Sequence, residues 1–353
     1  MTECFSKATF YGKATRMNGD IRMRFYGIMG SLPAPRQGAY IEAQNEALLA
    51  EFVQQYQQGG TLDPREFLAK QPRHKKSVYG GNTSCVEVVC GTKRIVWDMG
   101  SGARVLGASL MKEMFANGGL EIAFLLSHTH WDHIQGFPFF VPLFGKKGLG
   151  IKNNFTIYGG TKWMEDIEAC LQRQMEYRVF PVSWDEIKHM TESLLPRNIY
   201  DADQFDIGDT HVVVRLLNHP GGSLGYRLIY KDKVLAYTTD NEPFDPLYPD
   251  LPLVDTARGA DIWVTDCQYL QQVYLGLPEY GGLRRFGWGH SYPQAVAITA
   301  IEADVKLVVL FHHDPASTDA RIKQIEDEVC REIRARGHDI PVVAAYEGME
   351  LAL

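Results

Sequence analysis

Four side chains that can bind metal ions lie within the six-residue segment 128–133, which reads HTHWDH. In an extended segment residues two apart point the same way, so His128 and His130 can hold one ion while Asp132 and His133 turn towards a second. Imidazole and carboxylate ligands suit Zn²⁺, Mn²⁺ and Fe, and such a set leaves coordination positions free for water and substrate. The spacing therefore predicts a metal centre with open positions, not a chance group of surface histidines.

This segment lies where a buried strand is expected to end. Residues 122–126 form an apolar run, and residues 134–140 have the pattern of a turn followed by a short apolar helix. In open α/β sheets, ligands bind beyond the carboxyl ends of the strands. The element that precedes the segment therefore places its side chains where a binding site is expected.

The order of these residues resembles the HxHxDH signature of the metallo-β-lactamase superfamily. The resemblance continues on both sides, over roughly residues 77–315. It includes a GNTS turn at 81–84, a DMGSG loop at 98–102, a histidine and a GYR run at 219–227, and a GHS motif at 289–291. The later motifs are most similar to the tRNase Z-like or phosphodiesterase branch of the superfamily.

The resemblance implies a complete ligand set for two divalent ions, with zinc expected and manganese or iron as alternatives. The first metal would take His128, His130, His219 and Asp240, and the second Asp132, His133, Asp240 and His312. Position favours His312, directly after a predicted strand at 306–311, but His313 adjoins it and stays an alternative. Asp98 is either a turn-forming carboxylate or a support for the metal loop from outside the ligand set.

Two such ions would lower the pKa of a shared water towards about 7 and so provide a hydroxide nucleophile at neutral pH. Asp132, a ligand of the second metal in this set, is also counted among the catalytic residues. By the same resemblance, His290 is the general acid that protonates the leaving oxygen, oriented by Asp266. The branch usually has glutamate where this chain has Asp266, so the reach to His290 is shorter.

The predicted function is a hydrolase, most specifically a phosphodiesterase acting on a small diester such as a cyclic nucleotide. A formal charge of −7 and a pI near 5.9 disfavour a large nucleic-acid interface. Alternatives are a lactonase or thioesterase on the same metals, an RNA-processing nuclease and, last, a non-enzymatic ligand-sensing module. The candidate substrate contacts are Arg36, Asn82, Arg284, Arg285 and Trp288.

The fold expected from the resemblance is α/β (α+β), an αββα sandwich with two facing, mixed but mostly antiparallel β-sheets and helices outside. A single domain would span residues 1–353, with an N-terminal extension (1–22), a helical insertion (about 39–76) and a lid-like insertion (about 178–205). No apolar run is long enough to cross a bilayer and the six cysteines show no CxxC spacing, so a cytoplasmic protein with reduced thiols is expected. A homodimer is a further expectation of the resemblance.

Overall fold

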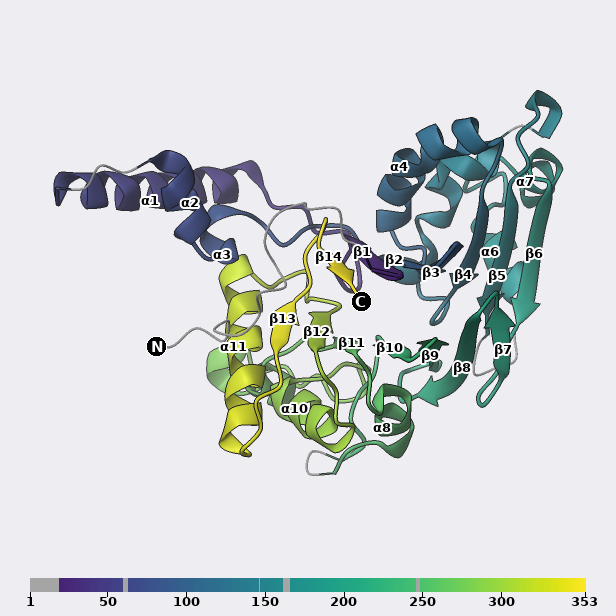
Figure 1. The fold of residues 1–353 in the computed structure, drawn as a ribbon. Coiled ribbons are helices and arrows are strands. Elements are labelled where there is room, and N and C mark those ends of the chain that lie inside the picture. The colour runs from purple at the N-terminus through teal and green to yellow at the C-terminus, as the bar shows by residue number, and fades with distance from the viewer. Residues whose placement is uncertain (1–18, 60–62, 146, 161–165, 246–247) are drawn as a thin grey trace.

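The computed structural model describes residues 19–59, 63–145, 147–160, 166–245 and 248–353. In this part of the chain, fourteen strands form two seven-stranded sheets that face each other, with helices on their outer sides (Figure 1). The αββα sandwich expected from the sequence is therefore confirmed.

The first sheet has the order β14-β1-β2-β3-β4-β5-β6. Its strands are β1 (Ile21–Gly27), β2 (Cys85–Cys90), β3 (Lys93–Trp97), β4 (Glu121–Leu125), β5 (Asn154–Gly159), β6 (Ser193–Asn198) and β14 (Glu350–Ala352). The helices α4 (Gly102–Asn117), α6 (Ile167–Arg173) and α7 (Trp184–Met190) belong to this half. Their apolar side chains share one core cluster with the outer face of the sheet.

The second sheet has the order β13-β12-β11-β10-β9-β8-β7. Its strands are β7 (Gln204–Ile207), β8 (Thr210–Leu217), β9 (Ser223–Tyr230), β10 (Lys233–Thr238), β11 (Ile262–Asp266), β12 (Val308–Phe311) and β13 (Val342–Ala344). Helices α8 (Leu251–Ala257), α10 (Pro293–Glu302) and α11 (Asp319–Ala335) cover it. The largest apolar cluster fills the space between the two sheets and continues beneath these helices.

Both sheets are mixed, as predicted, but neither is mostly antiparallel. Each of them contains three antiparallel and three parallel pairings among the described strands. Parallel neighbours need a crossover connection. Helix α4 connects β3 to β4, α8 connects β10 to β11, and α10 lies in the connection from β11 to β12. The carboxyl ends of these strands therefore meet at one edge of the sandwich.

Residues 178–205, which the sequence predicts to be a lid-like or a packing insertion, pack against the core in the structure. They contain α7 and β6, and the side chains of Trp184, Ile187 and Leu194 are buried in the core. Pro196 lies within β6, and it is tolerated there because β6 is the last strand of its sheet.

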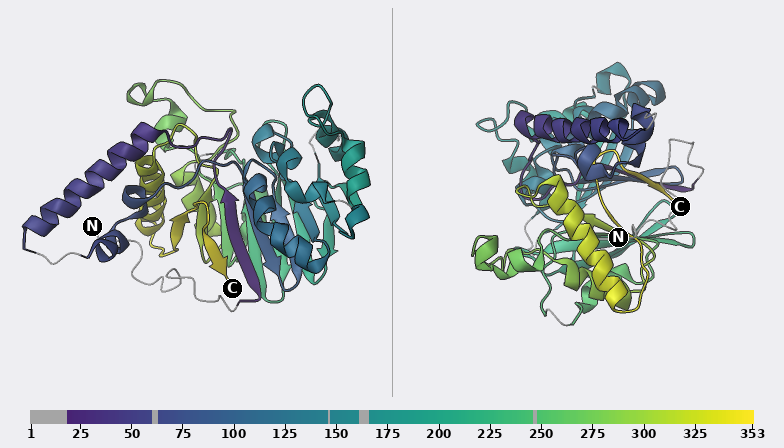
Figure 2. Two further views of the ribbon diagram at one scale, coloured as in Figure 1. Left: turned by 90° about the horizontal axis from the view of Figure 1, so that it is seen from above. Right: turned by 90° about the vertical axis from the view of Figure 1, so that its left-hand side faces the viewer.

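The other two predicted segments differ in how far the structure describes them. Most of the extension 1–22 lies outside the described residues, and Ile21 and Arg22 already pair with β2. The predicted helical insertion contains three helices among its described residues, α1 (Gly38–Gln57), α2 (Pro64–Lys70) and α3 (Arg73–Lys76). Helix α1 extends away from the sandwich (Figure 2). Within the described residues, no helix is both long and apolar enough to cross a membrane.

Candidate metal centre

The three-histidine cluster consists of His128, His130 and His219. His128 and His130 follow β4, and His219 follows β8, so the cluster joins one loop from each sheet. His128 Nε2 lies 2.8 Å from His130 Nδ1, and His219 Nε2 lies 3.1 Å from the same atom. Nitrogens from all three rings lie within 4.8 Å of one another, which suits a single bound cation.

The mixed cluster consists of Asp132, His133, Asp240 and His312, all of them buried. His133 Nε2 lies 3.1 Å from Asp132 Oδ2 and 3.1 Å from Asp240 Oδ2. His312 Nε2 lies 3.0 and 3.2 Å from the same two oxygens. Two imidazoles and two carboxylates thus converge from both sheets, again as a donor set for one divalent ion.

Asp240 lies between the two clusters. Its Oδ2 atom belongs to the mixed cluster, while Oδ1 lies 3.7 Å from His219 Nε2 and 4.0 Å from His128 Nε2. Thr239 Oγ1 donates a hydrogen bond to Oδ2. The residue follows β10 with φ of 53°, a left-handed conformation that a non-glycine residue adopts only when its surroundings hold it there. The carboxylate therefore presents one oxygen to each cluster.

Asp98 supports the mixed cluster from behind. This buried carboxylate follows β3 and lies 2.8 Å from His133 Nδ1. It also accepts hydrogen bonds from the Ser127 backbone N–H and hydroxyl and from the Tyr237 hydroxyl. Because Nδ1 of His133 is engaged in this way, its Nε2 faces the cluster. Of the two alternatives left open by the sequence, the structure shows support for the metal loop.

The structure places His312, not His313, in the mixed cluster. His313 Nε2 instead donates to the Ala345 carbonyl at 3.0 Å, and its ring lies edge-on to Tyr79. The imidazole of His312 rests on Gly30, where an added Cβ atom would lie 2.5 Å from the ring. Glycine is therefore required at residue 30 for this close approach.

The two clusters differ in protonation. Burial lowers the pKa of His219 to about 4 and that of His128 well below its ordinary value, so these imidazoles are neutral at neutral pH. Burial alone would also lower the pKa of His133, but the carboxylates of Asp132, Asp240 and Asp98 outweigh it and raise that pKa. Burial would raise the pKa of Asp240, and the opposing charges of His312 and His133 hold it well below its usual range.

These protonation states fit a pair of divalent cations. Neutral imidazole nitrogens and ionised carboxylates are the forms that bind metal, and a proton on His133 would be released on binding. The seven side chains supply donor atoms of the types that zinc accepts. The residues present therefore fit the two ions that the sequence predicts.

His290 and Asp266 form a close pair beside Asp240. His290 Nδ1 lies 2.6 Å from Asp266 Oδ2, and Asp266 Oδ1 accepts the backbone N–H groups of Gln268 and Ser291. The shorter side chain of aspartate therefore does reach. Burial would lower the pKa of His290, but Asp266 outweighs it and the net direction is upward. Donor atoms of this pair also come within 4.8 Å of those of Asp240 and His312.

The predicted substrate contacts fall into two groups. Arg36 binds the buried Asp319 through two nitrogens, and the Asn82 side chain binds Glu347 and Ser101, so both side chains are engaged in internal contacts. Their partners lie far away in the sequence, which hid these roles. Arg284, Arg285 and Trp288 lie in the loop before His290, and Arg284 and Trp288 are exposed.

Two supporting groups were not identified from the sequence. The Ser31 backbone N–H donates to Asp132 Oδ2 at 2.8 Å. The Glu242 carboxylate accepts hydrogen bonds from the Gly287 and Gly289 N–H groups and from the Tyr274 hydroxyl, at 2.7 to 2.9 Å. The one sequence signal for Glu242 is its position two residues after Asp240.

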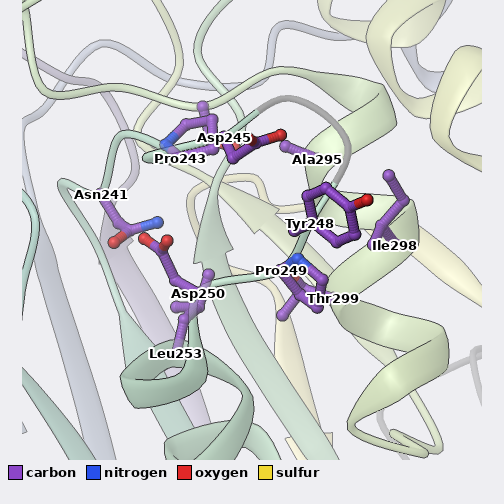
Figure 3. Close-up of a pocket in the computed structure, with 11 residues that line it drawn as sticks. Asn241, Pro243, Asp245, Tyr248, Pro249, Asp250, Leu253, Ala295, Ile298 and Thr299 are labelled. Atoms are coloured by element: carbon purple, nitrogen blue, oxygen red, sulfur yellow. The ribbon is translucent and has the colours of Figure 1, made fainter.

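A small cavity lies next to the centre, between the loop after β10 and helices α8 and α10 (Figure 3). Asn241 and Ser291 are among the residues that line it, and its volume is about 10 Å³. This is room for one water molecule at most. This cavity is therefore too small to hold a substrate, whereas His130 of the three-histidine cluster is exposed.

The fold and these clusters define the class of protein. Residues 122–313, more than half of the chain, match the family described as Beta-lactamase superfamily domain. The chain belongs to this superfamily.

Two curated relatives of this chain are both named Ribonuclease Z. A protein named Ribonuclease Z from Listeria monocytogenes is 26% identical over 173 residues, which cover 49% of this chain and 52% of that protein. Another Ribonuclease Z, from Macrococcus caseolyticus, is 29% identical over 107 residues, 30% of this chain and 31% of that one. The chain thus spans about half the length, or less, of the curated relatives it matches.

Solved structures agree on the fold. Zn²⁺-bound PqqB from Methylobacterium extorquens superposes with a TM-score of 0.59 at 15% identity, covering 94% of this chain and 100% of that one. Yeast PDE1 gives a TM-score of 0.59 at 12% identity, with 94% and 99% covered. At these identities the similarity concerns the architecture alone.

Proposed function

We propose that this chain is a metal-dependent phosphodiesterase. The observation that carries the proposal is the Asp240 carboxylate, whose two oxygens face two separate donor clusters, with the His290–Asp266 pair beside it. The names of the curated relatives, both Ribonuclease Z, support hydrolysis of a phosphodiester.

The ligand set would be divided as the sequence predicts. His128, His130 and His219 would hold one ion, Asp132, His133 and His312 the other, and Asp240 would contact both. Zinc is the proposed metal because imidazole dominates the donor set, with manganese and iron as alternatives. When bound, two such ions neutralise the charge of a phosphodiester and lower the pKa of a coordinated water.

His290 would donate the proton to the leaving oxygen. Its Nδ1 atom is bound to Asp266, so Nε2 is the ring nitrogen left for substrate. Asp266 shifts the pKa of His290 upward, towards the protonated form that an acid requires. Asp132, fixed by the Ser31 N–H, holds His133 and His312 in place.

The finer proposal for the substrate is a small diester such as a cyclic nucleotide. A second candidate, an RNA-processing nuclease, is favoured by the names of the curated relatives. The acidic chain, with a net charge of −7, favours the small diester. The homodimer and the cytoplasmic location stay predictions.

The test is hydrolysis of bis(p-nitrophenyl) phosphate by protein reconstituted with Zn²⁺ or Mn²⁺, compared with a lactone. We expect metal-dependent diester cleavage whose kcat falls by about 100-fold or more in His290→Ala, with unchanged metal content. His211→Ala is the matched control, because His211 lies on β8 and pairs with Asp206 at the surface. Lactone turnover without diester cleavage would move the function to the lactonase alternative.

A further inference from the structure

Two exposed tryptophans lie next to residues of the three-histidine cluster or their contacts. Trp131 directly follows His130 and is 80% exposed. Trp288 is 47% exposed and precedes Gly289, whose carbonyl accepts a hydrogen bond from His219 Nδ1 at 3.0 Å. Both tryptophans therefore expose indole surface in segments that contain or contact members of this cluster.

A cationic group accompanies the second tryptophan. The Arg285 guanidinium lies 4.4 Å from the centre of the Trp288 ring and 5.8 Å from that of Tyr269. Tyr269 in turn lies against His290, with 5.9 Å between ring centres. Within the described residues, neither Arg284 nor Arg285 forms an ion pair, so both positive charges are free to meet an anion.

The loop that carries Arg285 and Trp288 is held in place by contacts with Glu242 and Tyr274. Glu242 binds the N–H groups of Gly287 and Gly289, on both sides of Trp288. The Arg285 N–H donates to the Tyr274 carbonyl at 3.0 Å, and Phe286 packs on the Tyr274 ring. A surface that is already ordered loses little conformational entropy when a ligand binds.

We propose that Trp131, Arg285 and Trp288 form a nucleobase-binding platform beside the metal centre, so that the phosphodiester substrate is a nucleoside ester. Indole rings and guanidinium planes stack on bases without needing a particular sequence, and an unpaired arginine also attracts the phosphate. A neutral lactone would gain nothing from the two free arginines. The inference rests on the proposed function, because the phosphate is taken to lie on the metal centre.

Two kinds of substrate carry a base next to a phosphodiester: a small nucleotide and the end of an RNA strand. The discriminating ligands are adenosine 5′-monophosphate and ribose 5-phosphate, which carry the same phosphate and sugar and differ in the base. Binding to metal-reconstituted protein is measured by calorimetry, so that no turnover is needed.

We expect adenosine 5′-monophosphate to bind at least about tenfold more tightly than ribose 5-phosphate, as stacking of one base provides. Trp131→Ala and Trp288→Ala should each reduce this preference about threefold or more, and Trp131→Phe should keep most of it. Phe115→Ala is the control, since Phe115 is 62% exposed on α4, and it should retain the full preference. Equal binding of the two ligands, or a preference that both alanine variants keep, would overturn the platform.

The same protein separates the two proposals. Cleavage of bis(p-nitrophenyl) phosphate without any preference for the base would refute the platform and leave the phosphodiesterase standing. A base preference lost in the tryptophan variants, without diester cleavage, would support the platform and refute the phosphodiesterase. Binding of 3′,5′-cyclic AMP or of a short single-stranded RNA would support the platform, and the tighter of the two identifies the kind of substrate.

Discussion

The three-histidine cluster and the mixed cluster lie against the same carboxylate, Asp240, yet they differ in burial and charge. The first includes the exposed His130 and contains neutral imidazoles, whereas all four members of the second are buried and two are carboxylates. The first has few supports, such as the Gly289 carbonyl, while the second is braced by Asp98 and the Ser31 N–H. This difference defines an outer cluster, which includes an exposed histidine, and an inner cluster, which is fully buried.

The largest expected effect tests this division through stability. His133→Ala leaves the buried carboxylates of Asp98, Asp132 and Asp240 without their shared partner, and we expect the free energy of unfolding of the metal-free protein to fall by about 3–5 kcal/mol. His130→Ala, at an exposed residue, should cost about 1 kcal/mol or less. The measurement is denaturant unfolding in the presence of a chelator. An equal loss of unfolding free energy in the two variants would contradict the division into an outer and an inner cluster.

The next effect concerns metal affinity. Asp98→Asn weakens the group that orients His133, and loss of such an outer partner typically lowers affinity by about 10- to 100-fold. We expect this loss at one of the two ions, because Asp98 contacts the mixed cluster alone among the proposed ligands. Asp206→Asn, in the surface pair with His211, is the matched control. Competitive titration against a chelator with two resolved affinities gives the readout, and equal weakening of both ions would argue against separate inner and outer sites.

The smallest effect compares two glycines. Gly30→Ala places a Cβ atom 2.5 Å from the His312 ring, and such overpacking costs about 1–3 kcal/mol of stability. Gly221 lies beside His130 with φ of 84°, and an alanine there meets no atom closer than 3.9 Å, so about 1 kcal/mol of backbone strain is expected. The melting temperature of Gly30→Ala should be lower than that of Gly221→Ala. The reverse order would mean that the His312 ring can move away from an added methyl group at low cost, against the tight packing of the inner cluster.

Much of the centre could be predicted because its ligands follow strand ends in recognisable patterns. His128, His130, Asp132 and His133 lie in one short segment, and Asp240 and His312 each follow a buried strand. The supports could not be found in this way. Tyr237 and Glu242 act through contacts with residues distant in the chain. The spacing of neighbouring residues in the sequence gives no sign of such contacts.

The same limit explains why one strand and the internal partners of two predicted substrate contacts were not identified from the sequence. The short strand β14 was not anticipated, since its three residues carry little pattern and pair with β1 at the other end of the chain. Arg36 and Asn82 looked like free polar groups because Asp319 and Glu347, which bind them, lie more than 260 residues further along. Long-range pairing, not composition, determines what these residues do.

The most direct measurement of the central claim is the number of ions bound per chain. Wild-type protein, reconstituted with Zn²⁺, freed of excess metal and analysed by mass spectrometry for its metal content, should hold two ions. His130→Ala should retain the ion of the mixed cluster, and Asp240→Asn should weaken both. A wild-type chain that binds one ion or none would contradict a centre in which Asp240 is shared by two metals.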